Sequence, residues 1–157
     1  SSGVMNFKSL STAFTFALFS SSAFSYTFDP LIGTWKVIDH RTDAYISDIV
    51  IRKNSKTQQY SAVITQLHGA SKNLKNCQKC TGSLKNQPVI GMEVLQGLST
   101  NTNNSQFSHG LWTNPDNGYQ YKISGQLNHS KTQLQITGRT TQNHTTSMLW
   151  IKLQDVH

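Results

Sequence analysis

The sequence has few of the residues on which catalytic and metal sites depend. Among 157 residues there are two cysteines, three prolines and seven acidic residues, and Glu93 is the sole glutamate. One Cys-x-x-Cys pair supplies at most two of the four ligands that a structural zinc ion needs. Serine and threonine are so abundant that many combinations of Ser, His and an acidic residue are possible. No such combination therefore indicates a catalytic triad. The sequence therefore indicates no catalytic residue, no metal site and no cofactor.

Long hydrophobic runs and helical periodicity are also missing. The apolar run near the amino terminus covers about residues 10–19, which is shorter than the ~20 residues that a membrane-spanning helix needs. We therefore expect no transmembrane anchor. Beyond this run, no segment of ten or more residues shows a 3.6-residue hydrophobic period, which argues against crossover helices and a parallel sheet.

Acidic residues are outnumbered by basic ones, with 14 Lys and Arg and a formal net charge of +7. The basic residues are spread along the chain, whereas a nucleic-acid-binding surface needs basic and aromatic residues in a cluster. We therefore expect no nucleic-acid partner. The local exception is a group of four lysines around the cysteine pair, the loop lysines Lys72, Lys75, Lys79 and Lys85. This group is either a solvated loop or a surface for an anionic partner.

Residues 5–25 have the layout of a secretory signal peptide. Lys8 precedes the apolar run, and small residues follow it as far as Ser25. Cleavage after Ser25 or after Ala23 fits the small-x-small rule. Residues 1–4, ahead of the first methionine, we take as a cloning remnant. The remaining residues 26–157 are enough for one domain and too few for two. We expect a periplasmic or secreted, single-domain monomer.

From residue 26 onward, the hydrophobic period is two almost everywhere, and segments rich in Asn, Ser, Gly and Pro interrupt it at short intervals. This pattern predicts antiparallel strands joined by tight turns. For example, Tyr119, Tyr121 and Ile123 fall on one face, with Gln120 and Lys122 on the other. The strands that we predict are Leu31–His40, Ala44–Lys53, Gln59–His68, Pro88–Leu98, Gln106–Asn114, Tyr119–Asn128, Thr132–Thr141 and Thr145–Asp155.

Eight successive antiparallel strands either stack as a sandwich or close into a barrel. Closure removes the exposed edges, and eight strands enclose an interior that side chains fill or that holds one small ligand. The short, even connections favour up-and-down order over Greek-key crossings. We therefore predict an all-β fold, an eight-stranded antiparallel up-and-down barrel.

The segment "IGTWKV" places Gly33 two residues before Trp35 on the first predicted strand. A Gly-x-Trp at this point resembles the signature of the lipocalins and the wider calycin barrels. The resemblance implies that Trp35 closes one end of the barrel and that a basic residue of the last strand lies across its ring. Lys152, in "LWIKL", is the residue in reach of that role.

The chain from about residue 26 also resembles the small exported bacterial proteins grouped as the domain of unknown function 2147 family. The resemblance rests on "IGTWKVID", on "CQKCTG" followed by "NQPVIGMEVLQGL", on "GLWTNPDNGYQY", on "LQITG" and on the late "LW". The chain departs from the family pattern where a basic residue usually follows the final tryptophan directly, since Lys152 stands two places after Trp150. The resemblance implies an exported β-barrel and assigns no activity.

The cysteine pair, Cys77 and Cys80, lies in a polar loop with no helical pattern behind it. A thioredoxin-type pair instead begins a helix that follows a buried strand. A zinc site would have to recruit His68 and His109, which have no recognisable spacing. Two cysteines without a third favour a disulfide in an oxidising compartment. We predict a structural disulfide that pins the loop, and a redox-active pair and a metal site stay open as alternatives.

These features favour a non-enzymatic binding protein of the bacterial cell envelope, with a small apolar or amphipathic, lipid-like ligand. The ligand would enter at one open end of the barrel and contact its inward face. The residues that we predict to contact it are Ile64, Tyr121, Ile123 and Ile136. The alternatives are a surface interaction or stress-response module that uses the loop lysines, an envelope thiol–disulfide protein, and a barrel that is solidly packed.

Overall fold

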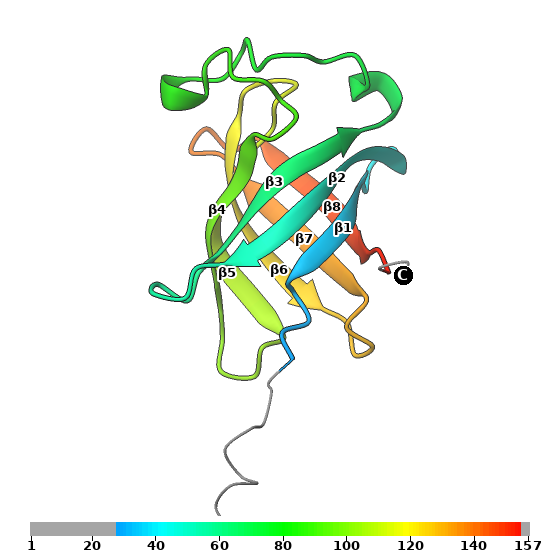
Figure 1. Cartoon of the computed structure of the whole chain (residues 1–157), viewed down its shortest axis with the longest axis vertical. Coiled ribbons are helices and arrows are strands. Elements are labelled where there is room, and N and C mark those ends of the chain that lie inside the picture. The colour runs from blue at the N-terminus through cyan, green and yellow to red at the C-terminus, as the bar shows by residue number, and fades with distance from the viewer. Residues whose placement is uncertain (1–27, 155–157) are drawn as a thin grey trace, which may run out of the picture.

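The computed structural model describes residues 28–154, which form a closed antiparallel barrel in the order β1-β2-β3-β4-β5-β6-β7-β8 (Figure 1). The strands are β1 (Gly33–Asp39), β2 (Ala44–Lys53), β3 (Tyr60–Leu67), β4 (Glu93–Thr100), β5 (Gln106–Thr113), β6 (Gln120–Leu127), β7 (Gln133–Arg139) and β8 (Thr145–Lys152). Two short 3-10 helices, η1 (Gly69–Ser71) and η2 (Gly82–Leu84), lie between β3 and β4. The predicted fold is confirmed. The predicted leader, the four residues before it and Asp155 lie outside the described residues.

The predicted strands differ from the observed ones most at β4. This strand begins at Glu93 rather than at Pro88, because the residues before it belong to the long β3–β4 connection, where Ile90 is 52% exposed. The first five residues of the predicted strand Pro88–Leu98 are therefore not part of a strand. Tyr119 precedes β6 and is 40% exposed, so it does not share the inward face of Tyr121.

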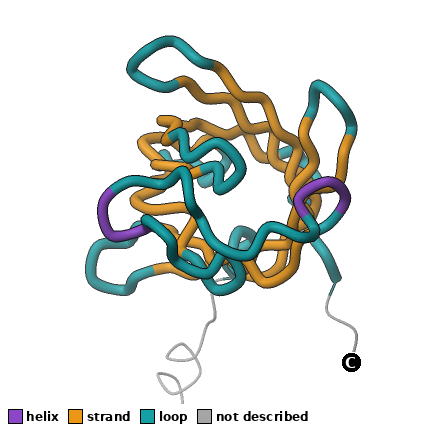
Figure 2. Tube along the Cα trace, turned by 90° about the horizontal axis from the view of Figure 1, so that it is seen from above, coloured by secondary structure: helices purple, strands orange, loops and turns teal. Residues whose placement is uncertain are grey.

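Because the strands run up and down, their connections alternate between the two ends of the barrel. The open end, at the top of Figure 1, carries the connections 40–43, 68–92, 114–119 and 140–144. The closed end carries the incoming segment 28–32 and the connections 54–59, 101–105 and 128–132. Seen from above, the strands form a complete ring with the two 3-10 helices at its rim (Figure 2).

Large apolar side chains fill most of the interior. Trp35 and Trp150 are fully buried, and the ring of Trp150 lies against that of Trp112 with centroids 5.2 Å apart. Burying a large apolar side chain contributes ~3 kcal/mol. The tryptophans therefore account for a large part of the stability of a domain of this size.

Gly33, Trp35 and Lys152 meet at the closed end. The Lys152 Nζ lies 5.0 Å from the centroid of the Trp35 ring and donates to the carbonyl oxygens of Pro30 (2.8 Å) and Ile32 (2.6 Å). Gly33 has a φ of +134°, and a Cβ at this position would lie 3.0 Å from the Lys152 Nζ. Glycine is required here because any larger residue would strain the backbone and displace the lysine.

The incoming segment 28–32 is held across the same end. The Trp35 Nε1 donates to the carbonyl oxygen of Leu31 (2.8 Å), and the Asp29 carboxylate accepts from the Leu31 amide (3.0 Å). The same carboxylate accepts from the Tyr60 hydroxyl (2.6 Å) and lies 3.6 Å from the Lys53 Nζ. These contacts hold the incoming segment across this end of the barrel, so we expect a ligand to enter from the open end.

Two tyrosine hydroxyls donate to carboxylates, Tyr60 to Asp29 and Tyr45 to Asp48. Burial, then the hydrogen bond to Asp48 and its negative charge, raises the pKa of Tyr45 to about 12. Burial, then the hydrogen bond to Asp29 and its charge, raises the pKa of Tyr60 as well. Since a tyrosine in the unfolded chain has a pKa of ~10, the stability that these pairs contribute is fully present below that pH. It is lost as the pH rises through the folded pKa values.

We expect tyrosinate absorbance to show that Tyr45 and Tyr60 ionise only at a pH at which the fold is lost. At about pH 11, between the unfolded and folded pKa values, the wild type and the Tyr45→Phe/Tyr60→Phe variant should have the same tyrosinate signal. The wild type should gain the additional signal only at higher pH, together with loss of fold by circular dichroism. A smaller tyrosinate signal in the variant already at about pH 11 would show that Tyr45 and Tyr60 ionise like unfolded tyrosines.

Candidate functional site

A cavity of about 140 Å³, here called the mouth cavity, lies at the open end of the barrel. The apolar and aromatic residues of its lining, here called the floor, are Ile46, Ile64, Leu67, Trp112, Tyr121 and Met148. The remaining lining residues, here called the rim, are Asp39, Arg41, Ser47, Ser71, Asn114, Pro115, Asp116, Asn117, Thr145 and Thr146. An apolar cavity of about 150 Å³ in another protein holds one benzene molecule. The mouth cavity therefore has room for one ring or a short alkyl group.

Two of the four predicted ligand contacts, Ile64 and Tyr121, line the mouth cavity. Ile123 and Ile136 also face the interior, at 1% and 0% exposure, but they lie among the core residues and not along the cavity. Alternation in the sequence identifies the inward face of each strand. It does not tell at what depth an inward residue lies, because depth depends on the stagger of all eight strands.

Sequence reasoning missed Trp112, one of the largest side chains of the cavity floor. Strict alternation from the buried Phe107 puts His109 and Leu111 inside and Trp112 outside. The register shifts between Phe107 and Gly110, and His109 has a φ of +65°, so one extra residue bulges out of β5. The bulge reverses the alternation, and Trp112 is 5% exposed.

The rim supplies hydrogen-bonding groups above the apolar floor. The Tyr121 hydroxyl accepts from the Asn117 Nδ2 (3.4 Å), and the Asp39 carboxylate accepts from the Arg41 amide (2.9 Å). The Asp39 carboxylate also lies 3.8 Å from the Arg41 Nε. A molecule with an apolar end and a polar end fits this arrangement. Among residues 28–154, no three His, Cys, Asp or Glu side chains lie close enough to hold a metal ion.

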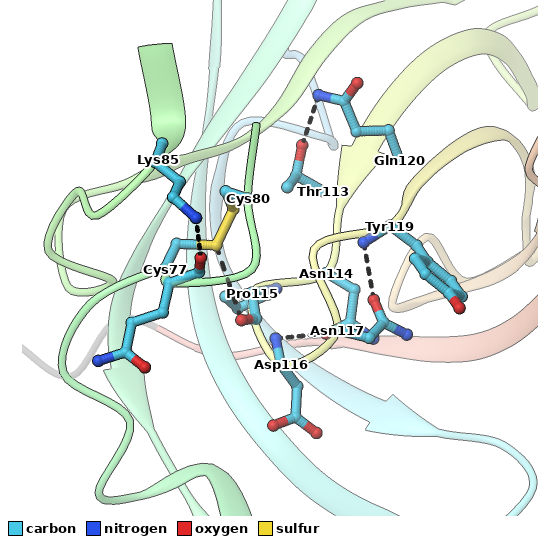
Figure 3. Close-up of a disulfide and its surroundings, with 11 residues drawn as sticks. Cys77, Cys80, Lys85, Thr113, Asn114, Pro115, Asp116, Asn117, Tyr119 and Gln120 are labelled. Atoms are coloured by element: carbon cyan, nitrogen blue, oxygen red, sulfur yellow. Dashed lines mark hydrogen bonds between the residues drawn. A yellow bond between two sulfur atoms is a disulfide. The ribbon is translucent and has the colours of Figure 1, made fainter. Parts of the chain in front are cut away.

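Cys77 and Cys80 form a disulfide in the β3–β4 connection, and both are buried (Figure 3). The Cys77 Sγ lies 3.6 Å from the carbonyl oxygen of Pro115, in the connection that lines the mouth cavity. Residues 77–86, here called the cysteine loop, are joined at their two ends by a hydrogen bond. The amide of Asn86 donates to the carbonyl oxygen of Cys77 (2.9 Å). The disulfide therefore supports one side of the rim.

Gly118, in the 114–119 connection, lies against the backbone of the cysteine loop. It has a φ of +77°, and a Cβ there would lie 1.9 Å from the carbonyl oxygen of Lys79. We expect Gly118→Ala to lower the free energy of unfolding by about 2 kcal/mol, through backbone strain and displacement of the loop. Equilibrium urea unfolding measures this loss.

The matched control is Gly82→Ala. Gly82 also has a positive φ, +62°, but a Cβ there meets nothing within 4 Å. This variant should show the backbone strain alone, about 1 kcal/mol. Equal losses in the two variants would mean that the cysteine loop does not press on the 114–119 connection.

The loop lysines are all exposed. Lys72 and Lys75 line a surface groove beside Ile90. The Lys85 Nζ instead donates to the carbonyl oxygen of Gln78 (2.8 Å), next to the disulfide. Two of the four lysines therefore line one groove, and a third is held beside the disulfide.

A closed antiparallel barrel of eight strands in up-and-down order, with a cavity at one end, defines a lipocalin-like fold. A solved structure, protein HP1028 from the human pathogen Helicobacter pylori, described as belonging to the lipocalin family, is similar to this chain with a TM-score of 0.64. The two share 17% identity over 80% of this chain and 84% of that chain, so the likeness shows the fold alone.

Residues 33–152 match the family described as "Uncharacterized protein conserved in bacteria (DUF2147)", and the chain belongs to this family. None of the curated proteins matches the chain. Within residues 28–154 there is no helix of the length and hydropathy needed to cross a membrane.

Proposed function

We propose that the protein is an exported, non-enzymatic binding protein that holds a small amphipathic ligand in the mouth cavity. The observation that carries this proposal is one cavity with an apolar floor and a polar rim, at the open end of a barrel that is otherwise packed. Pockets of this composition are the usual sites for small ligands. The lipocalin-like fold supports the same function by analogy.

The size of the cavity limits the ligand. A ring or a few methylene groups can occupy about 140 Å³, and a whole fatty-acid chain cannot. A lipid-like ligand would therefore insert only one end, and the rest of it would lie at the rim. We infer that the inserted group is packed between Ile64, Trp112 and Met148.

Export to the periplasm or beyond is supported by the leader pattern of residues 5–25 and by the disulfide, which persists in oxidising compartments. We propose cleavage that leaves residues 26–157 as one domain. The mass of the protein recovered from the periplasm or the medium should match a chain that begins at Tyr26 or Phe24. An uncleaved chain recovered only from the cytoplasm would contradict export.

Binding is tested by a nuclear magnetic resonance titration with 3-phenylpropanamide, a neutral molecule with one ring. We expect saturable shifts at the indole N–H of Trp112 and at the amides of Ile64 and Tyr121. The indole N–H of Trp35 at the closed end should not move and serves as the internal control. The proposal fails if no signal saturates or if the shifts centre on Trp35.

A second candidate function has one observation in its favour, the 52% exposed Ile90 beside Lys72 and Lys75. An apolar side chain flanked by lysines suits an anionic envelope surface. Replacing all four loop lysines with glutamine should then abolish sedimentation with phosphatidylglycerol vesicles without changing the circular dichroism spectrum. Unchanged sedimentation would remove this candidate.

A further inference from the structure

A second groove lies on the outer face of β6, β7 and β8, directly beside the mouth cavity. The two share three lining residues, Arg41, Thr145 and Thr146. We call it the outer groove. Its other lining residues are Lys122, Ser124, Thr137, Gly138, Arg139 and Ser147. A ligand at the rim of the mouth cavity can therefore reach the outer groove.

Three basic residues from separate parts of the sequence meet in the outer groove. Lys122 of β6 is paired directly with Arg139 of β7, and both are exposed on the outer face. Side chains directly opposite in an antiparallel pair project from the same face with Cβ atoms ~5 Å apart. Arg41 comes to the groove from the β1–β2 connection.

These charges are poorly balanced by acidic groups. No acidic residue lines the outer groove, and none of the ion pairs found within residues 28–154 includes Lys122 or Arg139. Arg41 has a loose pair with Asp39, 3.8 Å away, and its side chain is 75% exposed. Like charges directly opposite on a sheet are destabilising. A bound anion would convert this repulsion into attraction.

Hydroxyl groups add neutral donors beside the charges. Thr137 of β7 is paired with Ser124 of β6 on one side and with Ser147 of β8 on the other, which gives a row of three hydroxyls across the groove. The neighbouring row consists of Lys122, Arg139 and Thr145. Guanidinium, ammonium and hydroxyl donors together match the oxygens of a carboxylate or a phosphate.

We propose that the outer groove binds the acidic head group of the ligand whose apolar end lies in the mouth cavity. The inference rests on the proposed function and names the ligand class, an anionic amphiphile. The shared lining residues determine how one ligand can reach both the mouth cavity and the outer groove. Arg41, Thr145 and Thr146 stand between the apolar floor and the paired cations, so one short molecule spans both.

The test compares 3-phenylpropanoate with 3-phenylpropanamide, which have nearly the same shape and differ in charge. We expect the carboxylate to bind about tenfold more tightly at low ionic strength, with the advantage shrinking in high salt because exposed charges are screened. The Lys122→Gln/Arg139→Gln variant should lose the advantage and bind the amide as the wild type does. Benzyl phosphate in the same assay shows which head group the site prefers.

The matched control is Arg52→Gln/Lys56→Gln, which removes two exposed basic residues toward the closed end and should keep the advantage. Equal affinity of the wild type for the two molecules overturns the anionic head group. An advantage that survives in the Lys122→Gln/Arg139→Gln variant overturns the outer groove as the site of the head group. Either result leaves the mouth cavity as the binding site. Binding of the carboxylate without any binding of the amide overturns the mouth cavity and supports the outer groove. Failure of both molecules to bind overturns both proposals.

Discussion

Replacing Trp35 with alanine is expected to lower the free energy of unfolding by about 3–5 kcal/mol, the largest loss that we expect from a single substitution in this chain. The side chain is fully buried, its Nε1 donates to the Leu31 carbonyl, and the Lys152 ammonium lies over its ring. Alanine would leave a cavity and an unpaired carbonyl at the closed end. Equilibrium urea unfolding followed by far-ultraviolet circular dichroism measures the loss.

Trp35→Phe separates packing from the polar contact, because it keeps a ring under Lys152 and removes the indole N–H. We expect it to cost about 1–2 kcal/mol. Since Trp35 does not line the mouth cavity, this variant should bind 3-phenylpropanamide as tightly as the wild type. If Trp35→Ala cost less than about 1 kcal/mol, the barrel would not depend on Trp35 for its closure.

Filling the mouth cavity is expected to abolish ligand binding while the fold is retained. Thr146 lines the cavity from β8, two residues before Met148 of the cavity floor. In Thr146→Trp the indole would occupy the space of the ligand, and the affinity for 3-phenylpropanamide should fall at least tenfold, a loss of ~1.4 kcal/mol. Titration calorimetry measures the affinity, and circular dichroism verifies the fold.

Gln133→Trp is the matched control, since it adds the same side chain to an exposed position of β7 toward the closed end. Its affinity should equal that of the wild type. If folded Thr146→Trp binds as well as this control, the ligand does not occupy the mouth cavity.

The sequence predicts the barrel because the two-residue period is clear in β1, β6, β7 and β8. The predicted inward residues Tyr121, Ile123 and Ile136 are buried, whereas Tyr119, which precedes β6, is exposed. The period fails where the backbone changes phase, as at the His109 bulge, which turns Trp112 inward. A bulge is fixed by the pairing of two strands and leaves no reliable mark in one of them.

The grouping of the basic residues at the site could not be predicted from the sequence, for a different reason. Lys122 and Arg139 are both on outward faces in the sequence pattern, but their direct pairing depends on the register of the β6–β7 hairpin. Arg41 joins them only because closure of the barrel brings the β1–β2 connection beside β8.

The most direct test of the account is a crystal structure of the protein with bound 3-phenylpropanoate. The account predicts electron density for the ring in the mouth cavity, in van der Waals contact with Ile64, Trp112 and Met148, with the carboxylate at the rim toward Arg41. A mouth cavity that holds only ordered water, with the ligand absent or bound elsewhere, would contradict ligand binding in this barrel.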